Sequence, residues 1–357
     1  MDIDNRKKRL RRVIIRPNIT IADAIKILDS SGLGILLVCD QMNRLLGVIT
    51  DGDIRRAILK SISFADECIS IANTSPVCSK EGIPVKDALY MMDHTKKFYV
   101  NHLPIVDSEN RVVDLLLRRD FFEDGQVPLQ AVVMAGGFGT RLYPLTENIP
   151  KPMLQVGDKP VLQHIIARLK NSGINNIKIA THYLSEKISD YFGDGENFSV
   201  KLEYINEDDP LGTAGALGLI GKVHEPLLII NGDILTDIDF RKMHDFHREL
   251  YADLTVGVRH YEFQVPYGVI ECQGVNICGV SEKPKHQFFV NAGIYLIEPD
   301  VVDFIPKDVR YNMTDLIKNL IQEKKNVVSF PITEYWIDIG QLADLKRAQK
   351  DYINYST

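Results

Sequence analysis

The chain has 357 residues, 45% of them hydrophobic and 25% charged, which is typical of a globular protein with two or three domains. Its formal net charge of −6 argues against a general nucleic-acid binder. Five scattered cysteines contain no Cys-x-x-Cys pair, which argues against a zinc site or a disulfide framework, and we expect them to be reduced and mostly buried. Neither a membrane span nor a secretory signal is visible, so we expect a cytoplasmic protein without a membrane partner.

The N-terminal third contains the same unit twice, at about residues 8–62 and 70–122. The matching residues are Asp23, Ala24, Asp40 and Asp53 in the first unit, and Asp87, Ala88, Asp107 and Asp120 in the second. The predicted elements are helices at 21–30 and 85–93, strands at 34–39, 45–50, 102–106 and 111–116, and a second helix at the end of each unit. Because each short unit would bury too little surface alone, we expect the two to pack on one another.

The segment Gly47–Ile54, GVITDGDI, resembles the ribose-phosphate motif of CBS domains, which sense adenosyl compounds or nucleotides. The resemblance implies that the Thr50 hydroxyl meets a phosphate and that Asp53 accepts hydrogen bonds from a ribose. The second copy keeps Asp120 but has Leu117 in place of the hydroxyl residue, so at most one complete site for an adenine or guanine nucleotide effector is expected. The alternative is a repeat that only packs or dimerises. Since CBS pairs commonly dimerise, the resemblance also implies a homo-oligomer.

Residues 123–129 form the predicted linker, and strands alternate with helices after them, which predicts a mostly parallel α/β sheet. An apolar run at 131–135 predicts a buried strand that breaks into the loop Gly136–Gly139. Glycines allow such a loop to turn tightly and to approach a ligand, and its N–H groups can cradle an anion. Arg141 and Lys151 follow, as a nucleoside triphosphate would require. The loop does not match the Walker pattern. It is also not a complete G-x-G-x-x-G motif, because Leu142 stands where the third glycine would be. On the glycines alone, an ordinary turn after a strand is an equal alternative to a phosphate-binding loop.

Two later apolar strands end in carboxylates. The strand at 226–231 leads to Asp233, and the strand at 335–339 contains Asp338. Carboxylates are hard oxygen ligands of the kind that magnesium prefers. The segment from Leu211 to Leu217 is predicted to begin a helix. Two interpretations of it stay open, which are contact with a ligand at the helix N-terminus and an ordinary helix start. On a further predicted helix at 239–250, two histidines three positions apart are expected to form a surface pair rather than a metal site.

The string GGFGTRLYPLT…PKPML closely resembles the signature of sugar-phosphate nucleotidyltransferases, and the resemblance covers residues 130–351. It implies nucleotide-binding roles for Ala135, Gly136, Gly137, Gly139, Thr140, Gly212 and Thr213. It implies sugar contacts from Gly268, Glu282 and Asn291. It implies catalytic roles for Arg141, Lys151 and Lys283, and a Mg²⁺ ion held by Asp233 and Asp338.

The predicted fold is therefore α/β, with a Rossmann-like, mostly parallel mixed sheet at 130–357 preceded by an α/β tandem CBS pair at 1–122. The implied reaction joins a nucleoside triphosphate to a sugar 1-phosphate and releases pyrophosphate. The domain order looks most like guanylyltransferases that make GDP-sugars for surface glycans, in particular those acting on glucosamine 1-phosphate in legionaminic acid synthesis. Mannose-1-phosphate guanylyltransferases and glucose-1-phosphate thymidylyl- or uridylyltransferases are the alternatives. A nucleotide-sensing protein with an inactive transferase domain is the alternative of another class, and it is disfavoured because the charged residues are all present.

Overall fold

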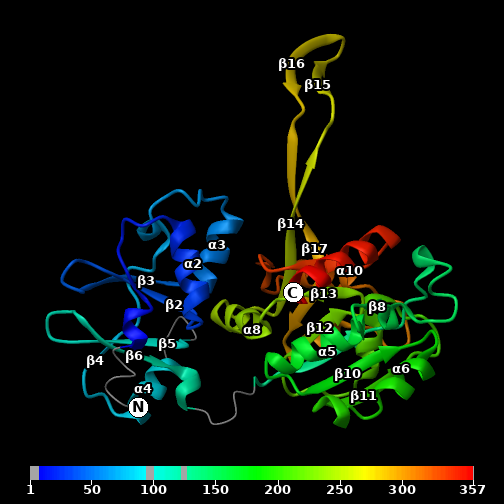
Figure 1. The fold of residues 1–357 in the computed structure, drawn as a ribbon, viewed down its shortest axis with the longest axis horizontal. Coiled ribbons are helices and arrows are strands. Elements are labelled where there is room, and N and C mark those ends of the chain that lie inside the picture. Colours follow the sequence, from blue (N-terminus) through cyan, green and yellow to red (C-terminus); the bar gives the residue numbers. More distant parts are fainter. Residues whose placement is uncertain (1–7, 94–99, 122–126, 357) are drawn as a thin grey trace. The chain divides into compact units, whose positions relative to one another are not determined.

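The computed structural model describes residues 8–93, 100–121 and 127–356, and these form two compact units (Figure 1). One unit comprises Met1–Pro128 together with Asp239–Ala252, and the other comprises Leu129–Ile238 together with Asp253–Thr357. Residues 123–126 of the predicted linker lie outside the described part of the chain.

The first unit contains two three-stranded sheets, one from each predicted repeat. The first sheet has the order β1 (Ile14–Ile15), β2 (Ile35–Cys39), β3 (Leu45–Thr50). The second has the order β4 (Ser79–Lys80), β5 (His102–Val106), β6 (Val112–Leu117). In both sheets the first pair of strands is parallel and the second pair antiparallel, so the sequence repeat is also a structural repeat.

The two repeats share one hydrophobic core. Val106, Leu115 and Leu117 of the second repeat are buried in a cluster made mostly of side chains from the first. A backbone bridge between Arg44 and Arg111 also joins the two. The prediction that the repeats pack on one another is confirmed.

Helix α2 (Ile21–Ser31) shows how local sequence sets the helix ends in this unit. The Thr20 hydroxyl accepts a hydrogen bond from the Asp23 backbone N–H at 3.1 Å, and Gly32 ends the helix with a φ of 63° that favours glycine. Further helical elements of this unit are α3 (Asp51–Leu59), α4 (Val85–Asp93), α8 (Phe240–Glu249) and the 3₁₀ turns at Cys68–Ile71 and Arg118–Phe121. A second helix was predicted at the end of the second repeat; within the described residues this segment is only the 3₁₀ turn Arg118–Phe121.

Helix α8 corrects one prediction. His244 and His247 are 6% and 0% exposed, so they are not a surface pair. Together with Phe240 and Met243 they follow the spacing that places side chains on one helix face, and all four are buried. The histidines therefore belong to the apolar face of the helix.

The second unit is built on a seven-stranded sheet. Its spatial order is β11 (Lys201–Asn206), β10 (Asn176–Thr181), β7 (Gln130–Met134), β12 (Leu227–Asn231), β17 (Lys285–Ile297), β14 (Leu254–Gln264), β18 (Val327–Pro331). Only β17 is antiparallel to its neighbours; the other adjacent pairs are parallel. The predicted mostly parallel mixed sheet is confirmed.

Helices and short ladders surround this sheet. The helices are α5 (Val161–Asn171), α6 (Ser185–Phe192), α7 (Gly212–Gly215), α9 (Met313–Gln322) and α10 (Leu342–Ser356). The 3₁₀ turns are Thr140–Leu142, Lys151–Met153, Glu196–Phe198, Ala216–Leu219 and Pro299–Phe304. The two-stranded ladders are β8 (Gln155–Val156) with β9 (Lys159–Pro160), and β13 (Ile234–Thr236) with β19 (Trp336–Asp338). Leu316 and Leu320 of α9 share a buried cluster with Val132 and Ile229, so α9 packs on the sheet.

Strands β14 and β17 continue beyond the sheet as a two-stranded ribbon. Its outer part is the hairpin of β15 (Gly268–Gln273) and β16 (Asn276–Glu282). We call residues 259–290 the ribbon arm; Figure 1 shows it extending away from the sheet of the second unit. Both exposed cysteines, Cys272 and Cys278, lie on it.

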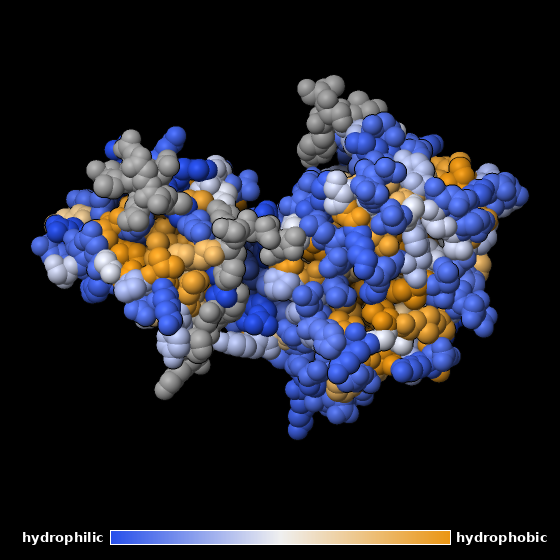
Figure 2. Space-filling model, turned by 90° about the horizontal axis from the view of Figure 1, so that it is seen from below, coloured by the Kyte–Doolittle hydropathy of each residue, from blue (hydrophilic) through white to orange (hydrophobic). Residues whose placement is uncertain are grey.

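No helix in the described ranges is long and apolar enough to span a membrane, and hydrophilic side chains cover most of the face shown in Figure 2, with apolar groups between them. All five cysteines are free thiols, but only Cys39 and Cys68 are buried, so the expectation that most are buried is wrong.

Candidate functional site

A cavity of about 320 Å³ opens where the loop after β7 meets the end of β12. The carboxyl ends of parallel strands are where ligands collect in open α/β sheets. Residues Met134–Leu142 form one wall of the cavity. The predicted nucleotide-binding residues Ala135, Gly136, Gly137, Gly139, Thr140, Gly212 and Thr213 all line it. The structure thus brings together residues that are far apart in the sequence.

Glycine is required at one loop position and leaves room for a close neighbour at a second. Gly139 has a φ of 65°, and a Cβ there would lie 2.9 Å from the Thr146 side chain. A Cβ on Gly136 would lie 2.9 Å from Oε1 of Glu207. A Cβ added at Gly137 would have no heavy atom within 4 Å, so the space beside this residue is open. The glycines therefore hold the loop close to its neighbours while leaving room on the cavity side.

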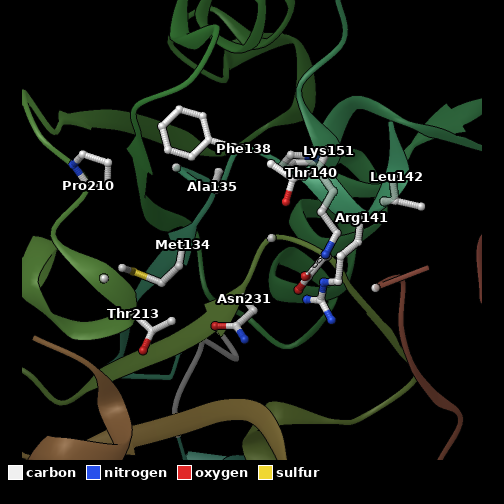
Figure 3. Close-up of a pocket in the computed structure, with 18 of the residues that line it drawn as sticks. Met134, Ala135, Phe138, Thr140, Arg141, Leu142, Lys151, Pro210, Thr213 and Asn231 are labelled. Atoms are coloured by element: carbon white, nitrogen blue, oxygen red, sulfur yellow. Dashed lines mark hydrogen bonds and ion pairs between the residues drawn. The ribbon is translucent and has the colours of Figure 1, made fainter. Parts of the chain in front are cut away.

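Positive side chains gather at one end of the cavity. Figure 3 shows Arg141 and Lys151 pointing toward the same region, opposite Phe138 and Pro210. The Lys151 ammonium forms an ion pair with the Asp233 carboxylate. Lys151 and Asp233 are both shielded, with side chains 11% and 20% exposed, so each largely neutralises the other's charge.

The β13–β19 ladder brings the second predicted carboxylate to the same place. Ile234 pairs with Asp338, and the Ile339 N–H donates to the Asp233 carbonyl at 3.0 Å. Partial desolvation, and then the negative charge of Asp233, raise the pKa of the Asp338 carboxyl, while Lys151 and Arg141 act in the opposite direction. A Cβ added at Gly340 would lie 3.4 Å from Oδ1 of Asp338 and 3.7 Å from a guanidinium nitrogen of Arg141, so these two predicted side chains lie close together.

The carboxylate cluster has features of a cation site. Oδ1 of Asp233 and Oδ1 of Asn231 are buried and have no hydrogen-bond partner within the described structure. Buried oxygens without a donor are unfavourable unless a ligand satisfies them. Among the described residues no group of three or more His, Cys, Asp or Glu side chains is arranged to hold a metal. The buried oxygens of Asp233 and Asn231 are hard donors, which fit an ion such as Mg²⁺ that shares its coordination with substrate oxygens.

The opposite wall of the cavity begins at α7. Gly212 has a φ of 83°, and a Cβ there would lie 2.8 Å from the Tyr311 carbonyl, so glycine is required. The Thr213 hydroxyl accepts a hydrogen bond from the Met313 N–H at 2.9 Å, which ties α7 to the start of α9. Thr213 thus positions this wall as well as lining the cavity.

Glu207 is a cavity residue whose role sequence reasoning did not assign. It is 8% exposed, and its Oε2 accepts from the Leu211 N–H at 2.9 Å. Burial raises the pKa of its carboxyl, while the Leu211 bond and His182 lower it. Glu207 follows strand β11 directly and so lies at the same sheet edge as the glycine loop. This position was the signal in the sequence that Glu207 could belong to the site, but the sequence does not show which way its side chain points.

The structure does not bring the predicted sugar-site residues to the cavity. Gly268, Glu282 and Lys283 lie on the ribbon arm and are not among the residues that line the cavity. Asn291 lies at the base of the arm, where its side chain accepts from the Gly293 N–H at 3.0 Å. Their roles remain predictions.

The predicted CBS ligand residues are occupied by contacts within the first unit. Thr50 and Asp53 form a capping box at the start of α3, in which Asp53 accepts from the Thr50 N–H and hydroxyl, both at 2.8 Å. Asp53 also pairs with Arg56 at 2.7 Å. Asp120 of the second repeat forms an ion pair with Arg9. The nucleotide site in this unit stays a prediction.

Comparison with known proteins identifies both parts of the chain. The nucleotidyl transferase family model matches residues 130–354, and the CBS domain model matches residues 9–60 and 68–124. Mannose-1-phosphate guanyltransferase of Saccharomyces cerevisiae is 31% identical over 237 residues, and mannose-1-phosphate guanylyltransferase of Mycobacterium tuberculosis is 32% identical over 233. Each alignment covers 63% of this chain and 65% of the relative's length.

A solved structure agrees with these matches. HddC from Yersinia pseudotuberculosis superposes with a TM-score of 0.51 at 26% identity, over 62% of this chain and 99% of HddC. A second structure of HddC is a complex with GMP-PN. The resemblances to sugar-phosphate nucleotidyltransferases and to CBS domains are confirmed: the chain belongs to the nucleotidyl transferase family, and a pair of CBS domains precedes its transferase domain.

Proposed function

We propose that this chain is a sugar-1-phosphate guanylyltransferase, which converts GTP and a sugar 1-phosphate into a GDP-sugar and pyrophosphate. The observation that carries the proposal is the cavity in which the glycine loop, the cations Arg141 and Lys151, and the carboxylate of Asp233 converge. A triphosphate needs backbone donors and positive charge, and a bound divalent ion needs free carboxylate oxygen.

The proposed reaction is in-line attack by a sugar-phosphate oxygen on the α-phosphorus of the nucleotide. The new P–O bond forms as the bond to the bridging oxygen breaks, and the electron pair leaves with pyrophosphate. Arg141 would neutralise the departing phosphates, and Lys151 would bind the phosphates from the cavity floor. A general base is not required, because a sugar phosphate is already ionised near neutral pH. Mg²⁺ held by Asp233 and Asp338 would supply further charge neutralisation when bound.

Glu207 supports guanine as the base. The Watson–Crick edge of guanine presents an N–H and an NH₂ side by side, and an ionised carboxylate is an acceptor that can take both. Glu207 lines the cavity beside Gly136, and burial raises the pKa of its carboxyl, so a donor pair in contact with the carboxylate would stabilise its ionised form. The names of the guanylyltransferase relatives, and the GMP-PN complex of HddC, point the same way.

Two sugars are candidates. The relatives named mannose-1-phosphate guanylyltransferases favour mannose 1-phosphate. The CBS pair ahead of the transferase domain favours glucosamine 1-phosphate, because that domain order resembles enzymes of legionaminic acid synthesis. In either case we propose that Lys283 contacts the sugar phosphate and that Gly268, Glu282 and Asn291 contact the sugar.

The CBS pair is proposed to bind a nucleotide that sets the rate. Thr50 and Asp53 are the proposed contacts to the phosphate and the ribose. Replacing Thr50 with alanine should remove a response to added adenine or guanine nucleotides and leave the basal rate unchanged. A rate that no nucleotide alters in the intact protein would refute this part of the proposal.

The test is pyrophosphate release with Mg²⁺ over a grid of five nucleoside triphosphates and the 1-phosphates of mannose, glucosamine, glucose and N-acetylglucosamine. Release with GTP and one sugar supports the proposal and identifies the product. Release with UTP or dTTP instead would refute guanine. A grid that stays blank after effector nucleotides are added would favour the binding-protein alternative. Asp233→Ala serves as the inactive control.

A further inference from the structure

Helix α8 belongs to the first unit, although in chain order it lies between strands of the transferase domain. The nucleotidyl transferase family model covers it, since that match runs over residues 130–354. The helix is nevertheless part of the compact unit that contains both CBS repeats. Two of its charged side chains, Lys242 and Glu249, form ion pairs with α3 of that unit. They are seven residues apart, which places them on one side of the helix, two turns from each other.

Both ion pairs end on the segment that resembles the CBS ribose-phosphate motif or on the helix that it begins. Oε1 of Glu249 lies 2.9 Å from a guanidinium nitrogen of Arg56, and the same nitrogen lies 2.7 Å from Oδ1 of Asp53. The Lys242 ammonium lies 3.4 Å from the Asp51 carboxylate. Arg56 therefore connects Glu249 of α8 directly to Asp53, one of the two proposed nucleotide contacts.

The glycine of the motif, Gly52, gives Glu249 room to approach. A Cβ at this position would lie 2.7 Å from Oε2 of Glu249 and 3.3 Å from a guanidinium nitrogen of Arg56. The Glu249 carboxylate thus lies against the first turn of α3, where the helix dipole and the unpaired backbone N–H groups favour an anion.

The position of Glu249 depends on its partner. The side chains of Arg56 and Glu249 are only 29% and 25% exposed. Burial raises the pKa of the Glu249 carboxyl, and the charge of Arg56 acts in the opposite direction. A partly buried carboxylate that loses its cation is more stable in water than where it was. Loss of Arg56 to another anion would therefore weaken the contact between α8 and α3.

A short, ordered connection leads from α8 to the predicted metal carboxylates. Strand β13 begins directly after Asp233, and only residues 237–239 separate the end of β13 from the start of α8. Within this connection Ile238 is 0% exposed, and its N–H donates to the Thr236 hydroxyl at 3.3 Å. Strand β13 also pairs with the strand that contains Asp338. The start of α8 is thus tied to the ladder that carries both carboxylates.

We propose that Glu249 is an internal anion that the phosphate of an effector nucleotide displaces from the start of α3. A phosphate at Thr50 brings negative charge to the helix end where the Glu249 carboxylate lies, and it competes with Glu249 for Arg56. The displaced α8 then shifts β13 and, with it, Asp233. This inference rests on the proposed nucleotide site in the CBS pair, and it identifies the element through which the nucleotide changes the rate.

Thermodynamic linkage makes the competition measurable. If Glu249 weakens nucleotide binding, the bound nucleotide weakens the docking of α8 by the same factor, and such factors are typically about 5–150-fold. Glu249→Gln removes the charge and keeps the shape of the side chain. Asp245→Asn removes the same charge from the same helix, at a side chain that is 47% exposed, and is the matched control.

The first readout is binding of ATP and of GDP to the full-length chain, measured by isothermal titration calorimetry. The part of the binding that Thr50→Ala abolishes is assigned to the CBS pair, so the readout does not depend on the proposed reaction. We expect Glu249→Gln to lower the dissociation constant of that part at least about fivefold, and Asp245→Asn to leave it within about twofold of wild type.

The second readout is pyrophosphate release with and without the same two nucleotides. Glu249→Gln alone should turn over at the rate that the wild type reaches with saturating nucleotide, and added nucleotide should no longer change that rate. Gly52→Ala is a second variant, because its Cβ displaces Glu249 without changing any charge, and it should lose the response as well.

The outcomes separate this inference from the proposed nucleotide site. Nucleotide binding that Thr50→Ala abolishes, with the dissociation constant and the rate response of Glu249→Gln equal to wild type, would overturn the inference and leave the site intact. Equal effects of Glu249→Gln and Asp245→Asn would overturn it too. A wild-type chain without any binding that Thr50→Ala abolishes would refute the nucleotide site, and the inference with it.

Discussion

The glycine loop allows a paired test in which the same methyl group is added at two positions, two residues apart. Gly139→Ala places a Cβ where φ is 65° and where the Thr146 side chain lies 2.9 Å away and the Lys151 Cβ 3.2 Å away. Gly137→Ala places it in open space beside the cavity, at a residue without a positive φ. The first change therefore acts on the fold and the second on the ligand.

The magnitudes follow from these distances. A left-handed conformation costs alanine about 1–2 kcal/mol. Overpacking against Thr146 adds about 1–3 kcal/mol. We therefore expect Gly139→Ala to lower the free energy of unfolding of the second unit by about 2–5 kcal/mol. We expect Gly137→Ala to change it by less than about 1 kcal/mol, because alanine fits there without strain.

The assay uses the single tryptophan. Trp336 lies in the second unit, where its indole N–H donates to the Ala292 carbonyl at 2.9 Å, so its fluorescence reports the unfolding of that unit. With a urea m-value of about 2–3 kcal/mol/M, Gly139→Ala should lower the midpoint by roughly 1–2 M. Gly137→Ala should keep the midpoint and raise KM for the nucleoside triphosphate. Equal midpoints for the two variants would refute the reasoning from the loop geometry.

Three further predictions concern single side chains. Lys151→Met should lower turnover at least about a hundredfold while unfolding stays cooperative, and near-wild-type turnover would contradict its place in the site. Because burial raises the pKa of Glu207, its stabilising contribution is lost as the pH rises through that pKa. Glu207→Gln should therefore be more stable than wild type at pH 8 and no more stable at pH 4, as measured by the urea midpoint. Ellman's reagent should rapidly label the exposed thiols of Cys272 and Cys278 in the native protein. Cys39 should react slowly, because burial raises the pKa of its thiol to about 12 and suppresses the reactive thiolate. Fast labelling of all five thiols would contradict this prediction.

Local sequence patterns determined the elements and the motifs. The strand at 45–50 and the helix at 85–93 were predicted with the bounds that the structure has, because the first is a short, mostly apolar run and the second carries apolar residues at helical spacing. The glycine loop after an apolar strand also followed from the sequence, since only glycine adopts the φ of Gly139 without strain. The repeat was visible because its two copies kept their turn-forming aspartates.

Only the tertiary structure decided which of these motifs meet. Lys151 reaches Asp233, and Asp338 reaches the same cluster, because strands distant in the chain pair side by side. Strand register is a long-range property that periodicity does not encode. For the same reason the sequence did not reveal that Glu207 turns into the cavity or that Lys283 lies on a ribbon arm outside it. The sequence thus determined the chemistry available to this protein, and the pairing of its strands decided where that chemistry is assembled.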